Sequence, residues 1–202
     1  SISIKNKLDE DTIHPVRVIN SIKNFISDKR DSPSKKLLTF AIDYLFQYEL
    51  RKKDSVLIDE TIKEGIGLSV FLGDLEDACQ KKDWSLAESL TLETFIASDS
   101  STGTMDVLAE ISLQNFQKNG MFVFHLLRAY NFQNIKEDNW AYTKCLFDYI
   151  KFHSLENPHT AVETTPSNIR DMAIKSENLT LYAAAERLWD GEYVRIRGFR
   201  RE

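Results

Sequence analysis

Apolar residues recur at helical spacing along most of the chain. After Pro15, for example, Val16, Ile19 and Ile22 follow one another at three-residue steps, which places them on one face of a helix. Similar stripes return through most of the sequence, and the strict alternation that is typical of strands is nearly absent. We therefore predict an all-α fold with about eight helices joined by short polar connections.

Residues that start or stop helices fall between these stripes. Pro15 suits the first turn of a helix, because the N–H that proline lacks would have no helical partner there. Asp83 is a good N-cap for the helix that follows it. Gly65 and Gly67 interrupt an otherwise helical stretch, so we expect a break or kink at this point.

The segment Met121–Tyr130 is apolar on nearly all sides, which predicts the central buried helix of the fold. We interpret Asn119-Gly120 as the end of the preceding helix, because both residues tolerate a left-handed backbone. This turn would join a hairpin over Asp106–Tyr130, and a second hairpin would span Leu68–Ala97. Consecutive antiparallel hairpins predict an irregular bundle or a short α–α superhelix, although no motif repeats at a fixed period.

Composition changes along the chain predict its domain organisation. Residues 1–13 form a polar lead-in, and residues 14–155 form the main helical domain. The stretch 156–168 has no apolar periodicity and is expected to be a loop. Helices within residues 169–190 then pack on the same domain, and residues 191–202 form a basic and aromatic extension that is not helical.

Overall composition narrows the function classes. The 202 residues carry a net charge of −5, which gives no general attraction to nucleic acid or to an anionic membrane. Seven glycines and four prolines are few for a fold rich in turns. The apolar run Met121–Leu127 contains His125 and is far shorter than the ~20 residues of a membrane span.

Cysteine usage and the first residues predict the compartment. Cys79 and Cys145 are too few to crosslink a chain of this length, so we expect core thiols in a reducing environment. The segment from Ser1 to Pro15 lacks a basic stretch followed by an apolar one, so no signal peptide is expected in it. Together these features predict a cytoplasmic protein.

Signatures of catalysis, cofactors and metals are absent from the sequence. The four histidines, His14, His125, His153 and His159, occur in no HExxH motif and in no pair of Glu-x-x-His units. No GxSxG motif and no glycine-rich phosphate loop occurs. We therefore expect no metal and no cofactor, and we assign no catalytic residue.

His125 is the candidate for a ligand-binding residue, because it lies in the most apolar helix. A buried imidazole needs a hydrogen-bond partner, so the plain interpretation is a core histidine bonded to a neighbouring polar group. The alternative is an internal pocket lined by His125, Arg128 and Tyr130, in which Arg128 binds an anionic group of the ligand. Such a pocket should be enclosed, with His125 exposed to it.

The C-terminal segment is the second candidate site, because it alternates basic and apolar residues. Its candidate partner-binding residues are Arg195, Arg197, Phe199, Arg200 and Arg201. Docking of this segment on the helical body and contact with a protein partner are the two main interpretations. Binding of nucleic acid through arginines and stacked rings is a third interpretation.

Taken together, the sequence predicts a non-catalytic helical interaction or scaffold protein with a protein partner. The alternative is a helical enzyme or ligand-binding protein with a pocket at His125 and Arg128, and the third interpretation is nucleic-acid binding through the tail. A scaffold protein should present a large open apolar surface, whereas a ligand-binding protein should enclose a cavity.

Overall fold

The computed structural model is all-α in the part of the chain that it describes, residues 13–48, 54–65, 69–98, 102–132, 139–153, 155–157 and 166–190. The helices are α1 (Pro15–Ser27), α2 (Lys35–Phe46), α3 (Asp54–Glu64), α4 (Leu72–Gln80), α5 (Trp84–Ala97), α6 (Thr102–Leu113), α7 (Phe116–Phe132), α8 (Asn139–Phe152), α9 (Pro166–Lys175) and α10 (Leu179–Asp190). The predicted fold class is confirmed, with ten helices in these ranges in place of about eight.

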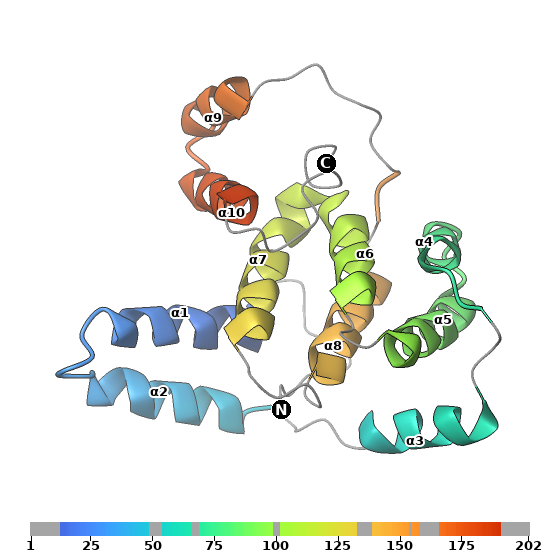
Figure 1. The fold of residues 1–202 in the computed structure, drawn as a ribbon. Coiled ribbons are helices and arrows are strands. Elements are labelled where there is room, and N and C mark those ends of the chain that lie inside the picture. Colours follow the sequence, from blue (N-terminus) through green and yellow to red (C-terminus); the bar gives the residue numbers. More distant parts are fainter. Residues whose placement is uncertain are drawn as a thin grey trace.

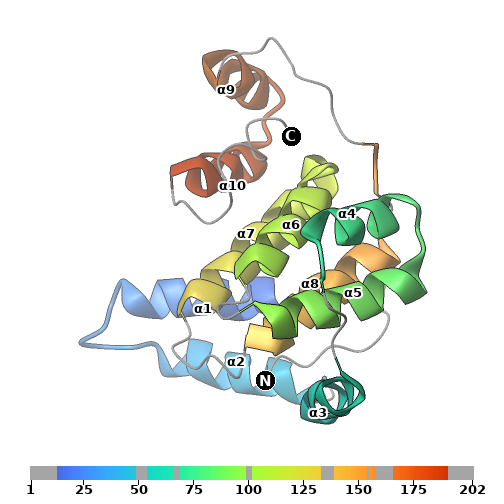
Figure 2. The same cartoon turned by 45° about the vertical axis from the view of Figure 1, so that its right-hand side comes forward.

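The helix α7 lies at the centre of the arrangement. It packs against α1, α6, α8 and α10, and neighbouring helices pair as hairpins: α1 with α2, α4 with α5, α6 with α7 and α9 with α10. The α1–α2 hairpin extends to one side of α7, while α4 and α5 lie on the other side and α9 and α10 lie near its upper end (Figures 1 and 2). The hairpin arrangement is therefore as expected.

The apolar character of α7 explains its central position. Phe122, Val123, Leu126 and Leu127 are each at most 1% exposed, so α7 buries side chains towards several neighbours at once. These neighbours supply the rest of one continuous core, which includes Leu75, Leu108, Ile111, Leu146, Ile150 and Leu188. A helix that is apolar all round can be covered only when other helices surround it.

Local signals place several helix ends where the sequence predicts them. α1 begins at Pro15, and the Val16 N–H donates to His14 Nδ1 at 3.2 Å. Asp83 caps α5 by accepting from the Leu86 N–H at 3.1 Å. α3 ends at Glu64, and the following Gly65 has φ +91°, a left-handed conformation that glycine adopts easily.

The predicted turn at Asn119-Gly120 is wrong, because both residues lie inside α7. The hairpin turns one helical turn earlier, at Gln114 and Asn115. Asn119 instead donates its side-chain N–H to the Ser112 carbonyl at 2.8 Å, and so satisfies an acceptor at the end of α6. Gly120 leaves room for a ring, since a Cβ atom there would lie 2.6 Å from Phe116.

The outer segments are described only in part. The predicted lead-in lies outside the described residues except for Ile13, and the whole of the predicted tail, residues 191–202, lies outside them. α9 begins at Pro166, within the stretch expected to be a loop, and Ala184 and Leu188 of α10 belong to the common core. The domain boundaries themselves stay predictions. None of the described helices combines the length and the apolar character needed to cross a membrane.

Candidate functional site

His125 lies where α7 meets α1, and it is only 6% exposed. The Asn20 side-chain nitrogen lies 2.8 Å from His125 Nδ1. Because an amide nitrogen can only donate, Nδ1 accepts this hydrogen bond and the imidazole proton is placed on Nε2. The plain interpretation of His125, a buried histidine bonded to a neighbouring polar group, describes this contact.

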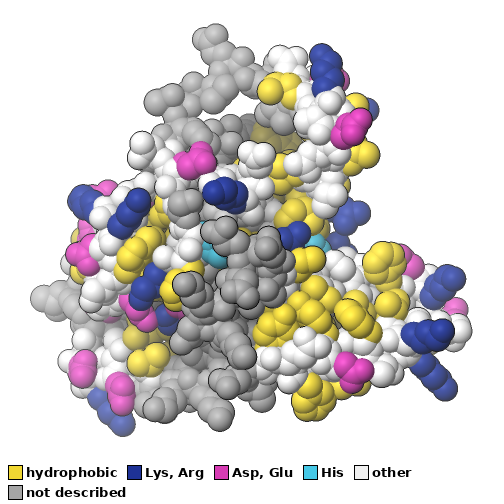
Figure 3. Space-filling model, turned by 180° about the vertical axis from the view of Figure 1, so that it is seen from behind, with side chains coloured by type: hydrophobic (Ala, Val, Ile, Leu, Met, Phe, Trp, Pro, Cys, Tyr) yellow, Lys and Arg dark blue, Asp and Glu magenta, His cyan; other side chains and the backbone are white. Residues whose placement is uncertain are grey.

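Positive charges surround His125. Burial is the main cause that lowers its pKa from 6.5 to about 4, and nearby cations lower it further. In decreasing order of effect, these cations are Arg17, Arg128, Arg187 and Lys23. We call these four residues the cationic junction, because they come from α1, α7 and α10, and both α1 and α10 pack on α7. In Figure 3, Lys or Arg side chains lie beside histidine atoms between α10 and the α1–α2 hairpin.

The three predicted ligand-binding residues are not all brought together. Arg128 is partly exposed and lies close enough to His125 to influence its pKa. Tyr130 contacts a different neighbour, since its ring meets Tyr142 of α8 edge-on at 6.1 Å between centroids. The candidate residues of the tail, Arg195, Arg197, Phe199, Arg200 and Arg201, lie outside the described residues.

Sequence reasoning missed three members of the junction and the partner of His125. Arg17, Asn20 and Lys23 follow one another at three-residue steps along α1, so they share one side of that helix. A row of polar residues beside the apolar stripe of α1 is the sequence signal that could have identified these three residues. Arg187 lies far along the chain, and only the packing of α10 on α7 brings it close.

A second buried histidine begins α1. His14 is 4% exposed, and its Nε2 lies 3.9 Å from Cys145 Sγ. Its ring meets Phe122 edge-on at 4.7 Å, and Phe122 stacks on Tyr149 at 3.7 Å. Burial, followed by the charges of His153 and Arg17, lowers the pKa of His14 to about 4. His14 therefore anchors the start of α1 in the core as a neutral side chain.

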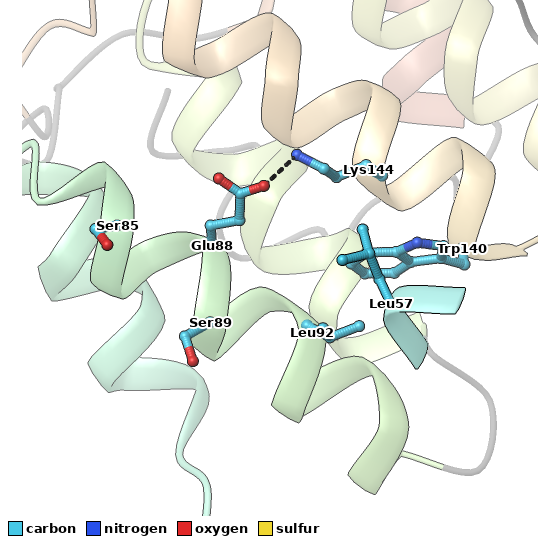
Figure 4. Close-up of a pocket in the computed structure, with 7 residues that line it drawn as sticks. All are labelled: Leu57, Ser85, Glu88, Ser89, Leu92, Trp140 and Lys144. Atoms are coloured by element: carbon cyan, nitrogen blue, oxygen red, sulfur yellow. Dashed lines mark hydrogen bonds and ion pairs between the residues drawn. The ribbon is translucent and has the colours of Figure 1, made fainter. Parts of the chain in front are cut away.

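A shallow pocket of about 220 Å³ lies between α5 and α8 (Figure 4). Its lining residues are Leu57, Ser85, Glu88, Ser89, Leu92, Trp140 and Lys144. Lys144 extends towards Glu88 and pairs with it at 2.8 Å, and it also pairs with Asp148 at 2.5 Å. The pocket thus lies away from the cationic junction.

The charges in this pocket balance one another. Burial tends to raise the pKa of Glu88, but its hydrogen bond to Lys144 and the charges of Lys144 and Lys151 lower the pKa overall. Lys144 Nζ also lies 4.9 Å from the Phe147 ring centroid. These contacts join α5 to α8 and leave no unbalanced charge in the pocket to attract a ligand.

An exposed apolar surface lies on α2, and none of the described side chains of this helix is buried. Leu37, Ala41 and Tyr44 are half-buried, as expected for the side that packs on α1. We call the remaining apolar stripe the outer face of α2; it consists of Leu38, Ile42, Leu45 and Phe46, which are 41%, 54%, 41% and 84% exposed. Hydrophobic side chains also gather over this hairpin in Figure 3.

Two further kinds of chemical group in the described residues are the thiol of Cys79 and the side chains that could bind a metal ion. Burial raises the pKa of the Cys79 thiol to about 12, so this cysteine stays protonated and is a poor nucleophile. No three His, Cys, Asp or Glu side chains in the described ranges come together as a group that could hold a metal ion.

Comparisons of the chain with protein-family models, with curated proteins and with solved structures find no match.

Proposed function

We propose that the chain is a non-catalytic interaction protein that binds a protein partner through the outer face of α2. The observation that carries this proposal is that a helix apolar on most sides has no buried residue. Exposed apolar patches of this kind are typical of surfaces that another protein covers. The helical spacing of Leu38, Ile42 and Leu45 suits a partner that presents an apolar helix or a groove of helical width.

The exposed surface is large enough to support binding. The exposed fractions of Leu38, Ile42, Leu45 and Phe46 add up to about two fully exposed large side chains. Burying two such side chains contributes roughly 3–6 kcal/mol, which corresponds to about 10²- to 10⁴-fold in affinity. The outer face would therefore supply a substantial part of the binding energy of a specific complex.

The thiols support a proposed location in the cytoplasm. Cys79 and Cys145 are both buried, at 0% and 1% exposure, and the structure joins neither in a disulfide. Core thiols of this kind are common in reducing compartments.

The test is a quantitative affinity purification from an extract of the source cells with three versions of the full chain. Ile42→Glu places a charge in the centre of the outer face. Gln47→Glu introduces the same charge at an exposed position just beyond the end of α2 and serves as the matched control. Both changes should leave the fold intact, because neither side chain is buried.

We expect a protein that the wild-type chain and Gln47→Glu retain and that Ile42→Glu loses. The loss should be at least about 100-fold, since a charge in an apolar interface has no partner. If the same proteins bind equally to Ile42→Glu and to the wild type, the outer face is not the binding surface.

A further inference from the structure

Independently of the proposed function, we propose that the cationic junction binds the phosphate group of a small phosphorylated molecule. Arg17, Lys23, Arg128 and Arg187 would surround the phosphate, and His125 would donate a hydrogen bond to it. Arginine suits this role because its planar group can donate two parallel hydrogen bonds to phosphate oxygens.

The charge of the junction is unbalanced. Neither α1 nor α7 contains an aspartate or a glutamate, and the two acidic residues of α10, Glu186 and Asp190, are not among the charges that shift the pKa of His125. None of the four cations forms an ion pair within the described residues, whereas Lys81, Lys144 and Lys151 all do. Like charges gathered without an ion-pair partner repel one another, so an anion is the group that would stabilise them.

Two of the four cations, Lys23 and Arg187, lie over aromatic rings of α7. Lys23 Nζ lies 4.2 Å from the centroid of the Phe132 ring, and the Arg187 guanidinium carbon lies 6.0 Å from that of Phe124. Both rings belong to α7, the helix that carries His125 and Arg128. Cation–ring contacts orient the side chains without neutralising their charge.

Lys23 and Arg128 lie close enough for their charges to repel each other. Burial, followed by the charge of Arg128, lowers the pKa of Lys23. An arginine on α7 and a lysine on α1 are thus close enough to repel each other. A single anion between them would interact with both side chains at once.

His125 adds a directed hydrogen-bond donor to the charges. Because Nδ1 accepts from Asn20 at 2.8 Å, the ring presents its N–H at Nε2. This N–H donates to no group among the described residues. The buried Asn20 Oδ1 atom also has no hydrogen-bond partner among the described residues, so the junction contains both a donor and an acceptor that a ligand could use.

A small phosphate fits these features better than a nucleic-acid strand does. All four cations lie close enough to His125 to lower its pKa, whereas binding along a strand requires a row of cations that follows the backbone. The net charge of −5 also opposes the approach of a long polyanion. A compact anion with two or more charges would experience mainly the local field of the junction.

The experiment is isothermal titration calorimetry of the full chain with inorganic pyrophosphate at constant ionic strength. The test variant is the double substitution Arg17→Gln and Arg128→Gln. The control is Arg170→Gln, which removes an exposed arginine of α9. We expect the wild type and the control to bind one pyrophosphate per chain, and the double variant to bind at least about tenfold more weakly.

A second readout locates the site in the unmodified protein. The imidazole NMR signals of His125 should shift as pyrophosphate binds, and its pKa should rise because an anion stabilises the charged imidazolium. Thermal unfolding separates a binding role from a structural one. Without ligand, the double variant should be at least as stable as the wild type, because it relieves repulsion between cations.

Three results would overturn the proposal. One is the absence of heat when pyrophosphate is titrated into the wild type up to about millimolar concentration, and another is equally tight binding of pyrophosphate to the double variant and to the wild type. Tighter binding of a single-stranded oligonucleotide than of pyrophosphate, with a steep salt dependence, would assign the junction to nucleic acid instead.

Discussion

Lowering the pH should destabilise the protein strongly, because two histidines are buried in their neutral form. His14 and His125 are 4% and 6% exposed, and both have a pKa of about 4, against 6.5 for an unperturbed side chain. Below pH 6.5 the unfolded chain binds protons at these positions, while the folded chain binds them only near pH 4. The contribution of these two histidines to the free energy of unfolding is therefore fully present above pH 6.5, and it is lost progressively as the pH falls towards 4.

The size of the effect follows from the difference between the two pKa values. Between pH 7.5 and pH 5.0, each histidine should lower the free energy of unfolding by about 2 kcal/mol, and both together by about 4 kcal/mol. Since domains are typically stable by about 5–15 kcal/mol, this loss is a large fraction of the total.

The assay is urea-induced unfolding, followed by far-ultraviolet circular dichroism at both pH values. The variant His125→Gln removes one of the two groups, so its free energy of unfolding should fall by only about 2 kcal/mol over the same pH range. A change of less than about 1 kcal/mol in the wild type would refute the reasoning. An equal change in His125→Gln and in the wild type would show that His125 does not titrate as described.

Two further predictions concern stability at neutral pH and are checked by the same urea assay. Gly120→Ala should destabilise by about 1–3 kcal/mol, because the new Cβ meets an aromatic ring, whereas Gly73→Ala has nothing within 4 Å and should stabilise by about 0.5–1 kcal/mol. Equal effects at the two sites would contradict the packing described. Lys144→Ala should cost about 2 kcal/mol, less than for a fully buried pair because the Glu88 side chain is 42% exposed. Lys81→Ala, in an exposed pair, should change stability by less than about 0.5 kcal/mol; comparable losses in the two variants would remove the proposed role of Lys144.

Periodicity and caps were sufficient to predict the fold class and several helix ends. Pro15 and Asp83 act through groups within one helical turn, so their signals can be interpreted without knowledge of tertiary contacts. Gly120 was misinterpreted because a glycine can serve either the backbone or a neighbouring side chain. Only the position of the Phe116 ring distinguishes these two roles.

The candidate site was less predictable than the fold. The sequence singled out His125 and Arg128 because they lie close together on one helix. It could not include Arg17 or Arg187, because their proximity depends on how α1 and α10 pack on α7. The exposure of the outer face of α2 could not be predicted for a related reason. An apolar stripe indicates a helix face that is normally buried, and only the packing shows that no described part of the chain buries this one.

Hydrogen–deuterium exchange of the chain, alone and in the complex recovered with the wild-type protein, tests the central claim most directly. We predict that peptides of α2 exchange rapidly in the isolated chain and become protected in the complex, while those of α7 stay protected in both. Protection that appears elsewhere and leaves α2 unchanged would contradict the assignment of its outer face as the binding surface.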